Sequence, residues 1–183
     1  MKSTHLTSMK HFLLFLFAFL FPACLFAGTD AEAAASPWGD KAPQPIYSFD
    51  GYANNENVKY LYFSGDLLWE LNQKNSPFKI GSWDIRNILG DLKGLLVMGS
   101  NKKSVIKRMQ RDINALESSK KFETLAHDSS IRIYGHHISG LNNKYDEVVV
   151  FMEMEGTQTI IQLFGRNNGI SARAFRELLP AKL

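Results

Sequence analysis

Three histidines are the side chains best suited to metal or acid–base chemistry after residue 27: His127, His136 and His137. His136 and His137 are adjacent in a segment whose alternating pattern predicts a strand. Their rings are therefore expected on opposite faces of a sheet, where they cannot bind one metal ion together. The HExxH spacing of zinc enzymes is also absent from the sequence. We predict no metal site, and we interpret the histidines as surface or strand-end residues.

Patterns typical of hydrolases are weak as well. The sequence has no GxSxG nucleophile elbow. Glu153 and Glu155 are predicted to share a strand face, where two carboxylates could act on a glycoside, but charged residues also keep edge strands soluble. Because no set of residues meets the geometric requirements of an active site, we predict no catalytic residues, no cofactor and no enzymatic activity.

Residues 99–104, with the sequence GSNKKS, form the candidate anion site. They follow an apolar run and open the longest predicted helix, whose first N–H groups and dipole favour an anion. The full phosphate-loop pattern is missing, so the alternative is a solvated pair of lysines. The residues that would bind the anion are Ser100, Asn101, Lys102, Lys103 and Ser104.

The same helix could contact anionic lipid through its basic side chains. Lys103, Lys107, Arg108 and Arg111 lie mostly off its apolar stripe. Asp112 and Glu117 are expected to dilute this charge, and aromatic residues are absent from that face. A solvated surface is therefore the expected state.

The first 27 residues are typical of a cleavable signal peptide. Lys2 and Lys10 precede an uninterrupted apolar run over residues 12–21, and small residues follow. We expect cleavage after Ala27, with Ala33 as the alternative site. An uncleaved N-terminal anchor is the other interpretation, although the run is short for a membrane span.

Cys24 is the only cysteine and a weak candidate for lipidation. The preceding residues 21–23 match a bacterial lipoprotein signal only at Ala23, and residues 25–26 continue the apolar stretch. Without a cysteine after residue 24, the exported chain can form no disulfide, thiolate zinc site or cysteine nucleophile.

Net charge gives no reason to expect a nucleic-acid partner. Two of the 21 basic residues, Lys2 and Lys10, lie in the leader, which leaves 19 basic against 18 acidic residues in the mature chain. A nearly neutral chain has no general attraction to polyanions. Membrane contact is expected only through the leader or a lipid on Cys24.

The periodicity predicts a single α+β domain over residues 58–183, after a flexible Ala/Pro-rich tether over residues 28–57 that could contact the domain through Ile46 and Phe49. We expect two layers, a mainly antiparallel sheet packed against helices, in the order β-α-α-β-α-β-β-β-α. The predicted strands are 58–63, 95–98, 131–136, 147–154 and 157–164, and the predicted helices are 67–71, 85–92, 101–116 and one that begins at Ser171.

Three stretches of this domain resemble an exported bacterial family, domain of unknown function 4252 (DUF4252). They are residues 59–71 (KYLYFSGDLLWEL), 113–137 (INALESSKKFETLAHDSSIRIYGHH) and 146–165 (DEVVVFMEMEGTQTIIQLFG). The middle stretch contains the family's step from a long helix into a strand, here residues 122–125. The resemblance covers residues 58–179 and implies an envelope protein of Gram-negative type that is not an enzyme. Many members look like lipoproteins.

Together these observations predict an exported, periplasmic or envelope-associated protein whose domain binds an envelope protein partner. The alternative is a periplasmic domain that binds a small ligand or anion at residues 99–104.

Overall fold

The computed structural model describes residues 43–81 and 83–176, all within one compact unit that spans residues 35–183. In chain order the elements are η1 (Asp50–Tyr52), β1 (Lys59–Ser64), α2 (Gly65–Gln73), β2 (Lys79–Ile80), β3 (Trp83–Asp84), η2 (Arg86–Asp91), β4 (Leu92–Ser100), α3 (Lys103–Ser118), β5 (Glu123–His127), β6 (Ile131–His137), β7 (Lys144–Met154), β8 (Thr157–Gly165), β9 (Ile170–Ser171) and α4 (Ala172–Arg176).

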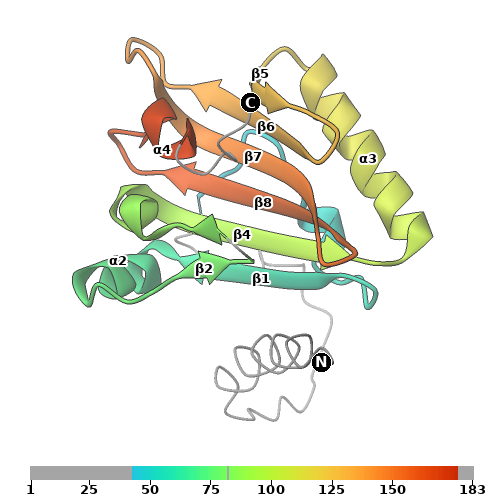
Figure 1. The fold of residues 1–183 in the computed structure, drawn as a ribbon. Helices are drawn as coiled ribbons and strands as arrows, with labels where there is room; N and C mark the ends of the chain where they lie inside the picture. The colour runs from blue at the N-terminus through green and yellow to red at the C-terminus, as the bar shows by residue number, and fades with distance from the viewer. Residues whose placement is uncertain (1–42, 82, 177–183) are drawn as a thin grey trace, which may run out of the picture. The chain divides into compact units, whose positions relative to one another are not determined.

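One antiparallel sheet organises the domain (Figure 1). Its strands lie in the order β1-β4-β8-β7-β6-β5, and the short β9 pairs with β7. The strands β2 and β3 form a separate two-stranded sheet. The predicted α+β class, with a mainly antiparallel sheet packed against helices, is confirmed.

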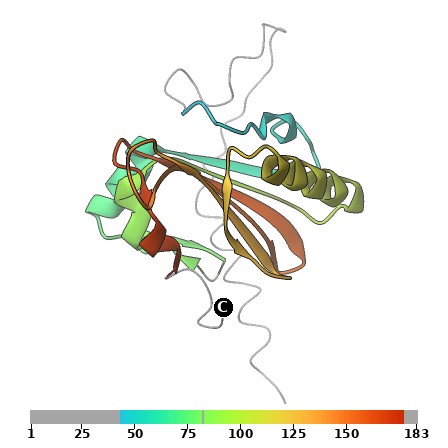
Figure 2. The same ribbon diagram turned by 90° about the horizontal axis from the view of Figure 1, so that it is seen from above.

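Both faces of the sheet are buried, which explains why its central strands are almost continuously apolar. In β7, Val148 and Val150 point into the α2-side core, where α2, η2 and the β2–β3 pair cover the sheet. Val149 and Phe151 point into the α3-side core. Figure 2 shows α2 and α3 on opposite sides of the curved sheet.

The α3-side core is closed by α3 and by residues 43–57, which run along the same face (Figure 2). The apolar stripe of α3 is fully buried there. We call residues 43–49 the strap. Its residues alternate between inward and outward positions, and Phe49 is only 2% exposed.

The predicted tether therefore extends too far along the chain. Residues 46–57 belong to the packed domain, because Phe49 and Tyr52 fill the α3-side core and Tyr52 lies under Arg108. The predicted contact through Phe49 is present, while the side chain of Ile46 points outward. Pro43 and Pro45 exclude a continuous α-helix in this segment, but they do not exclude an extended segment that lies on a sheet.

Two local structures follow directly from short sequence signals. Glu155 and Gly156 both have positive φ angles, +51° and +74°, and they join β7 to β8 in a two-residue hairpin turn. Ser64 caps α2, since its Oγ accepts a hydrogen bond from the Leu67 N–H.

Other elements differ from the predictions. The segment predicted as an α-helix over residues 85–92 forms the 3-10 helix η2 instead. Apolar residues spaced three apart fit both an α-helix and a 3-10 helix, so the pattern does not distinguish them. The helix predicted from residue 101 begins at Lys103, and its N-cap residue, Lys102, makes no side-chain cap bond. The strands β2, β3 and β9, which have two residues each, and the five-residue β5 were not predicted. The helix predicted from Ser171 is α4, and residues 177–183 lie outside the described residues.

Candidate functional site

The sheet brings two histidines and two carboxylates together at one end of β5, β6 and β7. His136 Nδ1 lies 2.7 Å from Asp146 Oδ1, and His137 Nε2 lies 3.0 Å from Glu123 Oε2. The pairing register of β6 and β7 shifts between His136 and His137, which aligns His137 with Tyr145. All four side chains are partly exposed.

The two histidine–carboxylate pairs lie on opposite faces of the sheet, as predicted for adjacent strand residues. The His136 ring contacts Phe122 of the α3-side core, and the His137 ring contacts Tyr145 of the α2-side core. Tyr145 also donates a 2.5 Å hydrogen bond to Glu123. Among the described residues, no group of three or more His, Cys, Asp or Glu side chains could hold a metal ion. The two pairs, together with the Tyr145–Glu123 bond, therefore connect β5, β6 and β7 at this end of the sheet.

The candidate anion site is only partly open to solvent. Ser100 is buried, and its hydroxyl donates to the Asn57 carbonyl at 2.7 Å and accepts from the Lys102 N–H at 3.2 Å. Asn101, Lys102, Lys103 and Ser104 are exposed. The Ser100 hydroxyl is thus used to turn the chain from β4 into α3, and anion binding at the other four residues remains a prediction.

The predicted processing residues Cys24, Ala27 and Ala33 lie outside the described residues. No helix in the described part of the chain is both long and apolar enough to cross a membrane.

A buried polar cluster that the sequence did not reveal fastens the strap to the sheet. Glu147 of β7 is 2% exposed, and its carboxylate accepts hydrogen bonds from the main-chain N–H groups of Ile46 at 2.5 Å and Tyr47 at 3.4 Å. Gln162 of β8 donates to Glu147 Oε1 at 2.6 Å and to the Tyr47 carbonyl at 2.8 Å. We call Glu147 and Gln162 the strap clamp.

The clamp recognises main-chain groups, so it holds the strap in place whatever the outward side chains are. Its glutamate is needed as an acceptor, because three donors converge on the two carboxylate oxygens. A weak signal was present in the sequence: Gln162 interrupts the apolar run of β8, and Glu147 directly precedes the apolar run of β7. Only the strand register brings these two side chains within contact.

Burial raises the pKa of Glu147 above its ordinary range, although the hydrogen bonds from Ile46, Gln162 and Tyr47 oppose the shift. A raised pKa in the folded state means that the folded protein binds a proton more readily than the unfolded chain. The stability from this group is thus fully present below the ordinary glutamate pKa and is lost as pH rises through the raised value.

We therefore expect wild type to lose stability relative to Glu147→Gln as pH rises from about 5 to about 8. Urea unfolding of both proteins across this range measures the difference. The comparison cancels the contributions of other carboxyls such as Asp84 and Asp128, whose lowered pKa values act in the opposite direction. A constant difference across this range would contradict the prediction.

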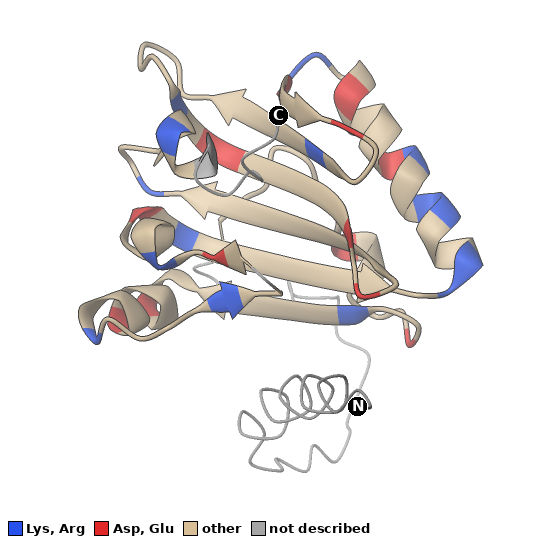
Figure 3. Ribbon diagram, in the orientation of Figure 1, with Lys and Arg blue, Asp and Glu red and all other residues tan. Residues whose placement is uncertain are grey.

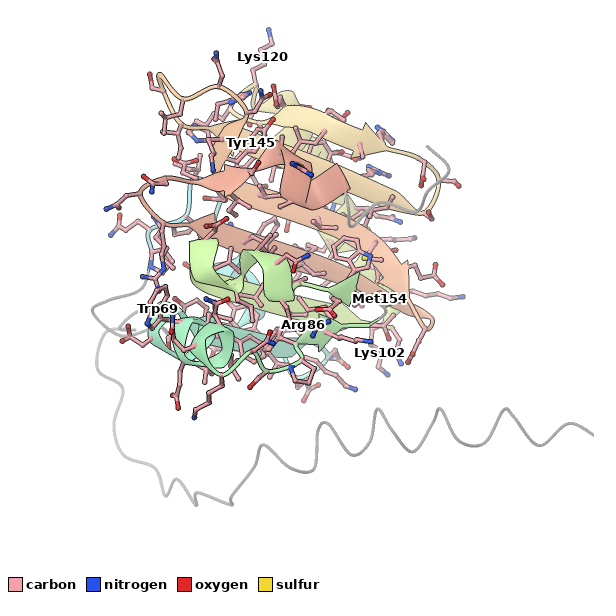
Figure 4. All side chains as sticks on the ribbon, turned by 60° about the vertical axis from the view of Figure 1, so that its left-hand side comes forward. Trp69, Arg86, Lys102, Lys120, Tyr145 and Met154 are labelled. Carbon is pink, nitrogen blue, oxygen red and sulfur yellow. The ribbon has the colours of Figure 1, made fainter. Side chains whose placement is uncertain are left out.

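On the other face of the sheet, α2 presents a large exposed aromatic side chain. Trp69 is 47% exposed, and Figure 4 shows it beside α2, away from Tyr145. The Arg166 guanidinium lies 5.3 Å from the centre of its ring. Arg166 is itself fixed by hydrogen bonds to the carbonyls of Leu92 at 2.9 Å and Gly65 at 3.0 Å. Leu67, on the same helix, is also exposed.

Sequence periodicity places Trp69 in α2 but does not show that it lies outside the core. Leu68 is the buried residue of this helix, and its two neighbours in the chain, Leu67 and Trp69, are large hydrophobic side chains that are exposed. The support from Arg166 depends on residues 97 positions apart in sequence, which no local pattern reveals.

These features define an α+β domain built on one antiparallel sheet that is buried on both faces. The model of the family described as domain of unknown function (DUF4252) matches residues 52–167, and the chain belongs to this family. The match confirms the suspected resemblance, and it begins within the segment that was predicted to be a tether. Comparisons with curated proteins and with solved structures found no match.

Proposed function

We propose that this chain is an exported envelope protein whose domain binds a protein partner and has no catalytic role. The proposed location rests on the signal-peptide pattern of residues 1–27 and on the family resemblance, which implies an exported envelope protein. The proposed mode of action rests on the α2 surface, defined here as Leu67, Trp69 and the supporting Arg166.

The observation that carries the proposal is the exposed Trp69 ring, held in place from behind by Arg166. Tryptophan and arginine are enriched among the residues that dominate protein–protein affinity, because a large rigid side chain loses little entropy on binding. Arg166 is fixed by main-chain carbonyls of two other segments, so the α2 surface is organised before any partner arrives.

The test is a pull-down from the native envelope with a tag at the C-terminus. We expect Trp69→Ala to weaken capture of the specific partner at least about ten-fold, since it removes the central aromatic contact. The matched control is Leu141→Ala, which shortens another exposed apolar side chain, and this variant should capture as wild type does.

Mass spectrometry of the purified bait checks the export part of the proposal. A mature N-terminus at Gly28 is the expected result. Equal capture by wild type and Trp69→Ala would reject the α2 surface as the binding site, and a bait that retains Met1 would contradict processing.

A further inference from the structure

A row of positive charge runs along the outer face of α3. Lys103, Lys107 and Arg111 are spaced four residues apart, so they follow one side of the helix over about 12 Å. Lys102 stands at the N-cap directly before them. All four side chains are exposed, and Figure 3 shows the basic positions gathered in the N-terminal part of α3. We call these four residues the basic stripe.

The acidic residues of α3 do not dilute the stripe as the sequence suggested. Asp112 accepts a 2.5 Å hydrogen bond from the hydroxyl of Tyr52 in η1. Glu117 accepts one at 3.3 Å from the hydroxyl of Tyr134 in β6. Each carboxylate is therefore engaged by a tyrosine of the domain, although Glu117 remains exposed near the C-terminal end of α3, away from the N-terminal turns that carry Lys102, Lys103 and Lys107.

No ion pair joins a stripe residue to a carboxylate in the part of the chain that the structure describes. The arrangement is unfavourable for the helix itself. Cations near a helix N-terminus oppose its dipole, like charges four residues apart repel, and Lys102 supplies no capping oxygen. Negative charge outside the protein would offset all three effects.

We propose that the basic stripe docks this domain on an anionic phospholipid surface. The stripe matches such a surface in charge, and it offers no large apolar anchor: the exposed large hydrophobic residues of the described chain are Ile46, Leu67, Trp69 and Leu141, none of them on α3. A protein partner would need such an anchor, whereas a layer of phosphate headgroups needs only charge.

Docking through α3 leaves the α2 surface accessible. The buried side of α3 belongs to one core and Leu68 of α2 belongs to the other, so the two surfaces lie on opposite sides of the sheet. The inference rests on the proposed envelope location but not on partner binding at Trp69.

The test is co-sedimentation of residues 28–183, which contain every described residue, with lipid vesicles at low salt. We expect binding to vesicles of phosphatidylglycerol mixed with phosphatidylcholine and none to phosphatidylcholine alone. The variant Lys103→Gln/Lys107→Gln/Arg111→Gln should bind about five-fold more weakly per charge removed, on the order of a hundred-fold in total. High salt should release the wild type.

The matched control is Lys74→Gln/Lys79→Gln/Lys93→Gln, which removes the same charge from exposed lysines outside α3. It should bind nearly as wild type does. Equal loss in both triple variants, or equal binding to both lipid mixtures, would overturn the proposal. Binding to poly-glutamate without binding to anionic vesicles would also overturn it, in favour of an acidic protein. Because purified lipids are the only other component, none of these results depends on the partner of the α2 surface.

Discussion

Replacing Glu147 with alanine is expected to lower the free energy of unfolding by about 3–4 kcal/mol, the largest effect that we predict for one side chain. The substitution removes the only carboxylate of the strap clamp. It leaves the N–H groups of Ile46 and Tyr47 without their acceptor, while the amide of Gln162 keeps only its bond to the Tyr47 carbonyl. Each unsatisfied buried donor costs about 1–3 kcal/mol, and water can relieve part of this cost only if the strap lifts from the sheet.

Urea unfolding measures this loss, and hydrogen exchange locates it. In Glu147→Ala the Ile46 and Tyr47 amides should exchange much faster than in wild type, while amides in the centre of β8 change less. Glu153→Ala is the matched control, because Glu153 lies on the same strand but is exposed, and it should change stability by less than about 0.5 kcal/mol. Similar losses in both variants would show that the clamp does not stabilise the fold.

Gly65→Ala should destabilise the domain by about 3 kcal/mol, although alanine is a better helix former than glycine. A Cβ at Gly65 would lie 2.6 Å from the Lys93 carbonyl oxygen and 2.9 Å from the Lys93 Cα. These are main-chain atoms of β4, which is held between β1 and β8 and cannot move aside easily. The start of α2 would have to shift instead, together with Leu68 in the α2-side core.

Gly140→Ala separates this steric effect from the general cost of losing a glycine. Gly140 has a φ of +81°, but no atom lies within 4 Å of the position that its Cβ would take. Gly140→Ala should therefore lower the free energy of unfolding by about 1–2 kcal/mol, from backbone strain alone. If urea unfolding shows that Gly65→Ala is no more harmful than Gly140→Ala, then the close contact with β4 does not limit this position.

The segment that the clamp holds also affects the basic stripe. The strap contributes Phe49 and η1 contributes Tyr52 to the α3-side core. The tyrosine hydroxyl in turn holds Asp112 away from the outer face. Packing on the inner side of α3 thus determines which charges remain on the outer side, and we expect a change at Tyr52 to alter both.

The sequence determined the elements whose side chains satisfy a local rule. The alternation in β6, the turn at Glu155 and Gly156 and the serine cap of α2 depend on neighbours a few residues away, so each was predictable. The same holds for the opposite orientation of His136 and His137. Family membership was also predictable, because its pattern spreads over most of the domain.

Tertiary structure alone decided the features that join distant segments. Glu147 reaches the Ile46 N–H across 101 positions, Arg166 supports Trp69, and Asp112 turns to Tyr52 across 60 positions. Periodicity reports which face of an element is apolar, but it does not report which strands are neighbours or in what register. Hydrogen bonds and close contacts act over a few ångströms of space, so the clamp, the support of Trp69 and the bond from Tyr52 to Asp112 exist only once the tertiary structure is formed.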